Sequence, residues 1–266
     1  MQTASIGRSR AFLVRLSARA GHLLFRCRDG LVPVAIVVLV AATTRNDLVA
    51  SAEMHAWLAL AGAVALLAGL TIRLWVLATT GVRRSGVRRR MVASTLFEQG
   101  PYAWCRNPLY LANGVMLIGL TAIFDSRWMA FVALPAALAA IASFVAAEER
   151  VLAETFGDQY RRYCDRVPRL VPRGLPAHGG RRPDWRRALR KEHGTIFAAT
   201  STALLLLAAE HRVRFGSFGA RRGPALIATW LVLAGAWLVV RRLKRTGRLS
   251  DAPELPAAGS ATDVAA

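Results

Sequence analysis

The sequence of 266 residues has little of several features that define whole classes of protein. Its three cysteines, Cys27, Cys105 and Cys164, are too few and too scattered for a disulfide scaffold. Its five histidines are dispersed, so we expect no metal site. No glycine-rich phosphate loop follows a strand pattern, which excludes a soluble dinucleotide-binding fold.

What the chain does contain points to a membrane. Apolar residues make up 54% of it, the mean hydropathy is +0.34 and the formal net charge is +20. Long apolar runs between arginine-rich loops are typical of integral membrane proteins. A spanning helix needs about 20 mostly apolar residues. The candidate spans are Leu31–Thr44, Trp57–Thr79, Leu109–Phe124, Trp128–Ala147, Thr195–Ala209 and Pro224–Val240.

Basic residues alternate between the segments that flank these spans. In chain order, the arginine and lysine counts are six, one, six, one, twelve, four and five. Because positive residues gather on the cytoplasmic side, this order predicts an all-α bundle of about six transmembrane helices with both termini in the cytoplasm. Asp125-Ser126-Arg127 would join two spans as a tight hairpin. Arg73 would either snorkel to the membrane surface or contact a cofactor or lipid headgroup.

The first informative cytoplasmic connection ends in Gly100-Pro101-Tyr102 and then Arg106-Asn107-Pro108-Leu109-Tyr110. Asn107 is a predicted N-cap and Pro108 the first helical residue. One interpretation is that the loop only marks the entry into the membrane. The other is that the helix start, with Arg106 beside it, binds an anionic group. Cys105 has no activating neighbour, so we expect a packing role.

The second informative connection begins with Glu148-Glu149 at the end of a span. Apolar and aromatic residues then recur at helical spacing, which predicts a short amphipathic helix that ends before Pro168: Leu152, Phe156, Tyr160, Tyr163 and Val167. The carboxylates could be a solvated helix end. Alternatively, a carboxylate at the membrane boundary needs a cationic partner, either Arg106 or a ligand.

Together, these two connections resemble the membrane methyltransferase superfamily of isoprenylcysteine carboxyl methyltransferase and phospholipid N-methyltransferase. The resemblance rests on Gly100-Pro101-Tyr102, Arg106 to Leu111, Glu148-Glu149 and Phe156 to Tyr163, and it covers roughly residues 70–172. It implies a membrane-embedded methyltransferase that uses S-adenosylmethionine. The acceptor would be lipophilic or small, of the isoprenylcysteine-carboxyl or phospholipid-amine type, and would be methylated at the cytoplasmic face.

The resemblance also implies a cofactor pocket. Matching positions that would line it are Gly81, Ser94, Thr95, Leu96, Phe97, Tyr102, Asn107, Pro108, Leu109, Tyr110, Glu148 and Glu149. Glu148 would face the sulfonium or the acceptor, and Arg106 and Asn107 complete the expected catalytic set. Methyl transfer is an in-line displacement that depends on alignment more than on acid–base chemistry. The general base is not identified.

Two positions depart from the superfamily's pattern. Many relatives have His where this chain has Asn107, and the eukaryotic prenylcysteine enzymes have Arg where it has Phe144. Both departures argue against a carboxyl acceptor and leave a lipid amine, a thiol or another small acceptor open. Two other functions stay open: a non-catalytic membrane protein that binds lipid or a partner, and a reductase of sterol type on a related fold.

The expected organisation has five parts. Residues 1–30 form a basic amphipathic segment, 31–175 the transmembrane methyltransferase core, 176–194 a basic cytoplasmic linker, 195–241 an additional transmembrane pair and 242–266 a disordered tail. We expect a bacterial inner-membrane protein whose partners are membrane lipids and the acceptor. The arginines of 161–191 would meet anionic headgroups rather than nucleic acid. The oligomeric state and the role of the last two helices stay open.

Overall fold

The computed structural model describes residues 47–49, 51–80, 96–172, 183–215 and 222–246. The segments 1–30 and 247–266 and the expected first span, Leu31–Thr44, lie outside these residues. The described part is all-helical, as expected. Its elements are α2 (Ala52–Thr80), α3 (Pro101–Trp104), α4 (Pro108–Phe124), the π-helical turn η1 (Met129–Ala133), α5 (Leu134–Arg166), α6 (Trp185–Phe215) and α7 (Arg222–Arg245).

Within the described ranges, three helical segments are long and apolar enough to cross a membrane, judged by length and composition. They are Ala52–Thr80, Met129–Arg166 and Gly223–Arg245. The helix α4 is apolar but shorter, at 17 residues. The helix α6 has 31 residues and carries charges near both ends, and it is not in this group. The count of about six spans therefore stays a prediction.

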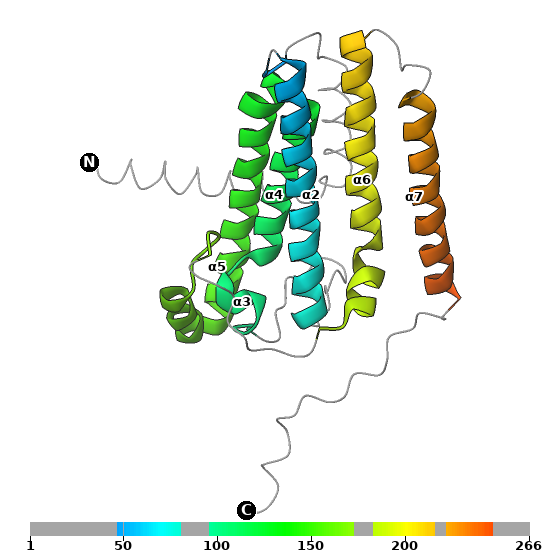
Figure 1. Ribbon diagram of the computed structural model, residues 1–266. Coiled ribbons are helices and arrows are strands. Elements are labelled where there is room, and N and C mark those ends of the chain that lie inside the picture. Colours follow the sequence, from blue (N-terminus) through cyan, green and yellow to red (C-terminus); the bar gives the residue numbers. More distant parts are fainter. Residues whose placement is uncertain (1–46, 50, 81–95, 173–182, 216–221, 247–266) are drawn as a thin grey trace, which may run out of the picture.

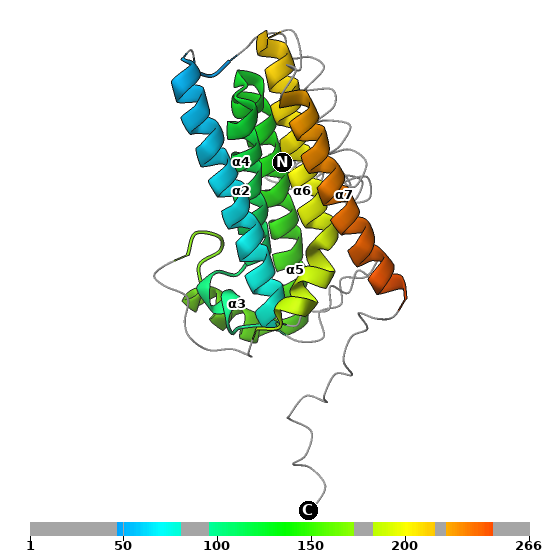
Figure 2. The ribbon, with the colours of Figure 1, turned by 45° about the vertical axis from the view of Figure 1, so that its right-hand side comes forward.

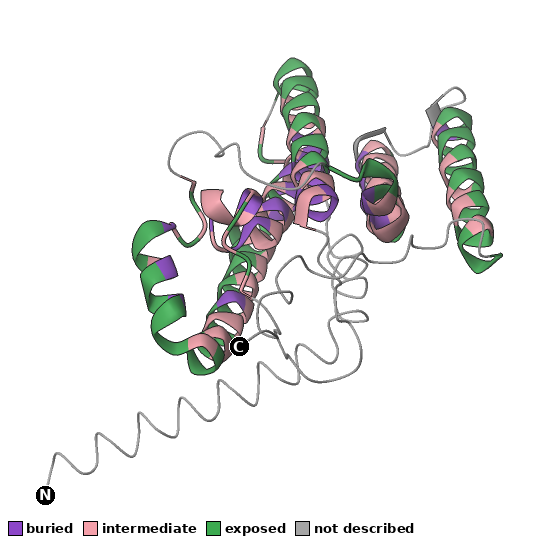
Figure 3. Cartoon of the chain, turned by 90° about the horizontal axis from the view of Figure 1, so that it is seen from below, coloured by how far each residue is buried: buried purple, intermediate pink, exposed green. Residues whose placement is uncertain are grey.

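The long helices stand side by side in a bundle (Figures 1 and 2). The helix α2 packs against α4 and α6, α5 packs against α4, and α7 lies outside α6. The main apolar cluster joins α2, α4, η1 and α6: Leu66, Leu70, Met116, Ile123, Phe124, Met129, Ala199, Ala203 and Leu206. In Figure 3 the buried residues gather inside the bundle, whereas α7, at the right, is exposed along most of its length.

The contact between α2 and α4 is close because both helices present glycine. A Cβ atom built on Gly62 would lie 2.6 Å from the carbonyl oxygen of Gly119, and a Cβ on Gly119 would lie 2.6 Å from that of Gly62. Real Cβ atoms do not approach a backbone oxygen so closely. Small residues at helix contacts in membranes allow the backbones to meet in this way.

The α4–α5 hairpin turns at Asp125, as its sequence predicts. Asp125 is a non-glycine residue with positive φ, at 49°, and its carboxylate is fully buried. Its Oδ1 accepts a hydrogen bond from the amide of Val49 at 3.3 Å, and its Oδ2 lies 3.0 Å from Nδ1 of His55. On the other side of the ring, Nε2 of His55 lies 3.2 Å from Oε1 of Glu210 on α6. We call His55, Asp125 and Glu210 the His55 cluster.

Arg73 neither snorkels to the surface nor lies open to a headgroup. It is 3% exposed and forms a two-pronged ion pair with Glu192 of α6, through Nε and Nη2 at 2.9 Å each. Its Nη1 donates to Oδ1 of Asn113 on α4 at 2.6 Å. The cation therefore has partners inside the protein. We call Arg73, Asn113 and Glu192 the Arg73 cluster.

The helix α6 begins at Trp185, inside the segment expected to be a linker. Asp184 starts it: its carboxylate accepts a hydrogen bond from the amide of Arg187, and its own amide donates to the carbonyl of Ala78 at the end of α2. Asp is a favoured residue at a helix start because its carboxylate satisfies a free amide. The ring of Phe197 then stacks on Trp237, which attaches α7 to α6.

Candidate active site

The loop before α4 is shaped by its glycine and prolines. Gly100 has a φ of 61°, a conformation that glycine adopts without steric cost. Pro101 starts α3 and Pro108 starts α4, where the fixed φ of proline suits the first helical turn. The amide of Arg106 donates to the carbonyl of Pro168 at 2.9 Å. The loop is thereby tied to the segment that follows α5.

The helix α5 reaches the same place from the opposite direction and then bends. Gly157 has a φ of 51° and a ψ of −121°, which is not helical, so the residues after it change direction. Tyr160, Tyr163 and Val167 are buried there, and four partly buried residues pack against them: Leu96, Leu152, Phe156 and Cys164. The hydroxyl of Tyr163 donates to the carbonyl of Tyr102 at 2.7 Å. The aromatic residues expected on one helix face therefore lie against the loop of α3.

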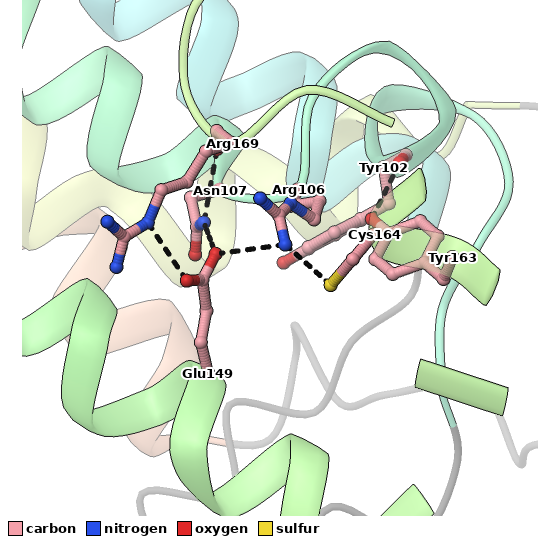
Figure 4. A network of polar contacts seen from close by, with 7 residues as sticks. All are labelled: Tyr102, Arg106, Asn107, Glu149, Tyr163, Cys164 and Arg169. Atoms are coloured by element: carbon pink, nitrogen blue, oxygen red, sulfur yellow. Dashed lines mark hydrogen bonds and ion pairs between the residues drawn. The ribbon is translucent and has the colours of Figure 1, made fainter. Parts of the chain in front are cut away.

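Glu149 is the centre of the polar network at this end of the bundle (Figure 4). Its Oε1 accepts a hydrogen bond from Nδ2 of Asn107 at 2.9 Å, and its Oε2 lies 2.9 Å from Nε of Arg169. Nη1 of Arg106 lies 3.8 Å from Oε1. The Glu149 side chain is 14% exposed. This set of donors fixes the carboxylate in position.

Asn107 occupies the expected N-cap position of α4, but its side chain does not cap the helix. No side-chain hydrogen bond to the helix start forms. Its Nδ2 donates instead to Glu149 and, at 3.1 Å, to the carbonyl of Arg169. The buried amide satisfies two acceptors from α5 and the segment after it. The anionic group beside Asn107 and Arg106 is therefore the chain's own Glu149.

Glu148 differs from its neighbour. It is half-buried, and among the described residues its carboxylate has no hydrogen bond or ion pair. It lies near enough to Tyr102 to act on it electrostatically: burial and then the Glu148 carboxylate raise the pKa of the Tyr102 phenol well above its usual range. Of the two acidic residues, Glu148 is thus the one that stays available to a ligand.

The guanidinium of Arg106 has one nitrogen that forms a hydrogen bond and another that forms none among the described residues. Its Nη1 donates to the sulfur of Cys164. Its Nε is buried and has no hydrogen-bond partner among the described residues. A buried donor without a partner is costly, which makes it a place where a ligand oxygen would be stabilised.

The other predicted cofactor residues divide into three groups. Gly81, Ser94 and Thr95 lie outside the described residues. Leu96 packs in the cluster of Tyr160 and Tyr163. The remaining residues surround the loop: Phe97 is exposed with its ring centroid 6.4 Å from that of Tyr102, and Pro108, Leu109 and Tyr110 form the first turn of α4.

Arg169 and Cys164 belong to the network but were not among the expected site residues. Arg169 follows Val167-Pro168, the pair that ends α5, and its guanidinium and carbonyl both reach the network. The sequence signal for Arg169 was its position directly after this helix stop; only the fold brings it within 2.9 Å of Glu149. Cys105 is fully buried, and burial raises its thiol pKa to about 11, in accord with a packing role. The described ranges contain no group of three or more potential metal ligands.

Comparison with known proteins identifies a segment that carries part of this network. Residues 57–159 match the model of the phospholipid methyltransferase family. The match runs from α2 into α5 and includes Tyr102, Asn107, Glu148 and Glu149. The resemblance to the membrane methyltransferase superfamily is therefore confirmed for residues 57–159, which make up less than half of the chain.

Two curated relatives are similar over part of the chain. One is the cobalt-zinc-cadmium resistance protein CzcN of Cupriavidus metallidurans, 34% identical over 30% of this chain and 37% of its own length. The other is the nickel-cobalt-cadmium resistance protein NccN of Alcaligenes xylosoxydans xylosoxydans, 28% identical over 56% of this chain and 67% of its own. The chain thus spans little more than a third of CzcN. No solved structure gives a significant match.

Proposed function

We propose that this protein transfers a methyl group from S-adenosylmethionine to a lipophilic or small acceptor at the cytoplasmic face of the membrane. The family match of residues 57–159 supports membrane methyl transfer. The observation that carries the finer proposal is the contrast between two adjacent carboxylates. Glu149 is held by Asn107, Arg106 and Arg169, whereas Glu148 has no partner among the described residues.

The available groups fit the polar part of S-adenosylmethionine. The cofactor supplies an electrophilic methyl group on a sulfonium and carries an ammonium and a carboxylate. Glu148 would bind a cationic centre, and the unpartnered Nε of Arg106 would donate to a carboxylate. The rings of Phe97 and Tyr102, 6.4 Å apart, offer apolar faces to a purine. Glu149 would act indirectly, because it holds Arg106 and Asn107.

A lipid amine suits this site better than a carboxylate acceptor. Phe144 lies one helical turn before Glu148 and is half-buried. This position therefore holds an aromatic ring and not a cation that could bind an acceptor carboxylate. Asn107 already donates to Glu149 and Arg169. A carboxylate acceptor would thus meet Glu148 without a second cation to offset the repulsion. A neutral amine would meet no such repulsion.

The cytoplasmic placement of the site rests on charge. The end of α2, α3, the start of α6 and the end of α7 lie at the same end of the bundle, the lower end in Figure 1. The last turn of α7 carries Arg242, Lys244 and Arg245. Gathering of basic residues at one end favours the cytoplasmic side of an inner membrane, with both termini there.

Calorimetry on the detergent-purified protein tests the cofactor. We expect S-adenosylmethionine to bind the wild type, and Glu148→Gln to weaken binding about 10- to 100-fold, since hydrogen bonds to charged groups contribute about 1.5–3 kcal/mol. Glu154→Gln is the matched control, because Glu154 is an exposed residue of the same helix. No binding by a wild type that unfolds cooperatively would favour a non-catalytic binding protein or a reductase.

Labelled methyl transfer tests the acceptor and accessibility tests the orientation. Incubation with methyl-labelled S-adenosylmethionine and a lipid extract should label an amine-containing lipid, and Glu148→Gln should abolish the label.

For orientation, single cysteines would be introduced between residues 81 and 100 in a chain lacking Cys27, Cys105 and Cys164. Labelling of those cysteines from the outer side of intact cells would refute the cytoplasmic placement.

A further inference from the structure

The helix α6 lies outside residues 57–159, the segment that matches the family, yet it is fastened near both of its ends to α2, most of which lies in that segment. Near its start, Glu192 pairs with Arg73 of α2; near its end, Glu210 lies 3.2 Å from His55 of α2. Eighteen positions separate His55 from Arg73, and eighteen separate Glu192 from Glu210. The two helices are therefore antiparallel and held in one register (Figures 1 and 2).

The distance between the two clusters is close to the thickness of the hydrocarbon layer of a membrane. At about 1.5 Å per residue, eighteen positions span roughly 27 Å, close to the hydrocarbon thickness of about 30 Å. Between the clusters, α6 contributes Ala199, Ala203 and Leu206 to the apolar core. Charges buried in a membrane protein are costly without partners, so each cluster specifies where α6 lies along α2.

The Arg73 cluster differs from the His55 cluster in lying next to the candidate active site. Nη1 of Arg73 donates to Asn113, which lies on α4 in the turns that follow Asn107. The ring of Trp75, two residues after Arg73, makes an edge contact with Trp104 of α3 at 5.8 Å between centroids. Two of the elements that carry the site, α3 and α4, thus contact the part of α2 that is paired with α6.

The start of α6 reinforces this hold. The amide of Asp184 donates to the carbonyl of Ala78, and Ala188 is fully buried against Leu77 and Ala78. Glu192 itself is 2% exposed and receives both hydrogen bonds of the Arg73 fork. A buried guanidinium that lost this carboxylate would have to move or bring in water, and Asn113 would move with it.

We propose that Glu192 is a positioning residue for the active site: through Arg73 it fixes α2 and α4, and thereby Asn107 and the α3 loop with Tyr102. The ligand-binding part of this inference rests on the proposed function. It assigns to α6, which lies outside residues 57–159, a role in the site that acts through α2 and α4. Misplacement of binding groups by about 1 Å costs up to about 100-fold in rate, so small shifts suffice.

The test compares two variants of the same helix. Glu192→Gln removes the charge beside the site, and Glu210→Gln removes the charge at the opposite end. Both should lower the melting temperature. Only Glu192→Gln should weaken S-adenosylmethionine binding, by about 10-fold, which corresponds to the loss of one hydrogen bond from a displaced binding group. In hydrogen exchange without ligand, Glu192→Gln should speed exchange in residues 101–113, whereas Glu210→Gln should affect the region around Asp125.

Two further variants separate positioning from folding. Asn113→Leu leaves the ion pair of Arg73 with Glu192 intact and removes only its link to α4, so the protein should fold and still show faster exchange in α4. Exchanging the charges, with Arg73→Glu and Glu192→Arg in one chain, should restore slow exchange in residues 101–113. Rescue by the exchange would show that pairing, and not the identity of either residue, positions the site.

The outcomes decide the inference independently of the proposed function. If Glu192→Gln and Glu210→Gln weaken binding equally, or if neither Glu192→Gln nor Asn113→Leu changes exchange in residues 101–113, the inference is overturned. If the wild type binds no S-adenosylmethionine, the proposed cofactor is wrong. The exchange measurement, which needs no ligand, then supports or overturns the positioning role by itself.

Discussion

Glu149 should stabilise the folded protein, whereas its neighbour Glu148 should stabilise only a bound ligand. The carboxylate of Glu149 accepts from Asn107, pairs with Arg169 at 2.9 Å and lies 3.8 Å from Arg106. The carboxylate of Glu148 has no such partner among the described residues. Replacement of each by glutamine therefore separates structure from binding at two consecutive positions.

The size of the effect follows from burial. The side chains of Glu149 and Arg106 are 14% and 17% exposed, whereas that of Arg169 is 46% exposed. The pair with Arg169 is half in solvent and contributes about 0–1 kcal/mol. The hydrogen bond from Asn107 and the charge beside Arg106 are largely buried, and hydrogen bonds to charged groups contribute about 1.5–3 kcal/mol.

We therefore expect Glu149→Ala to lower the free energy of unfolding by about 3 kcal/mol. Glu149→Gln keeps an oxygen that accepts from Asn107 but loses the charge, so its cost should be about 1–2 kcal/mol. For a chain of this size, each kcal/mol lowers the melting temperature by roughly 2–4 °C. The alanine variant should thus melt roughly 6–12 °C below the wild type.

Thermal unfolding followed by tryptophan fluorescence in detergent measures these shifts, with Glu148→Gln as the matched control. Glu148→Gln should melt within about 2 °C of the wild type, because it removes no contact among the described residues. Equal melting temperatures for Glu149→Gln and Glu148→Gln would refute the division of roles. A lower melting temperature for Glu148→Gln than for Glu149→Gln would reverse it.

Three further predictions concern packing, a hydrogen bond and a thiol. Gly119→Ala should destabilise the protein by about 1–3 kcal/mol in thermal unfolding, because its Cβ would lie 2.6 Å from a carbonyl oxygen of α2; Gly235→Ala, with nothing within 4 Å, should not. Tyr163→Phe should cost about 1 kcal/mol in the same assay through loss of the 2.7 Å bond to the Tyr102 carbonyl. Cys105, whose pKa is raised to about 11 by burial, is almost wholly a thiol at pH 8. Alkylation of its peptide, followed by mass spectrometry, should therefore be slow at pH 8 and quicken toward pH 11, and rapid modification at pH 8 would contradict this.

The turns and helix starts at the site could be predicted from the sequence, because they depend on the backbone conformations that individual residues prefer. Gly100 takes a positive φ and Pro108 begins α4, and both follow from the conformations those residues prefer. Asp125 closes the hairpin at the predicted position. The side chain of Asn107 was the exception at this level: a tertiary acceptor, Glu149, replaced the local capping bond.

The separate roles of Glu148 and Glu149 could not be predicted from their order in the chain. Consecutive residues of a helix point about 100° apart, so the two carboxylates meet different parts of the α3–α4 loop. Which of them meets Asn107 depends on how α5 is rotated against α4. That rotation is fixed by packing over the whole helix, including Gly114 against Leu138.

The ion pair of Arg73 with Glu192 could have been predicted only from a pattern that relates two distant helices. Arg73 and Glu192 are 119 positions apart, and Glu192 lay in a segment expected to be a linker. Judged alone, a single arginine near a helix end suggests snorkelling. The equal eighteen-residue intervals from His55 to Arg73 and from Glu192 to Glu210 are visible in the sequence. A histidine and an arginine on one apolar helix, at the same interval as two carboxylates on another, predict antiparallel pairing. Each buried polar side chain then meets a partner, and neither helix can slide without separating both pairs.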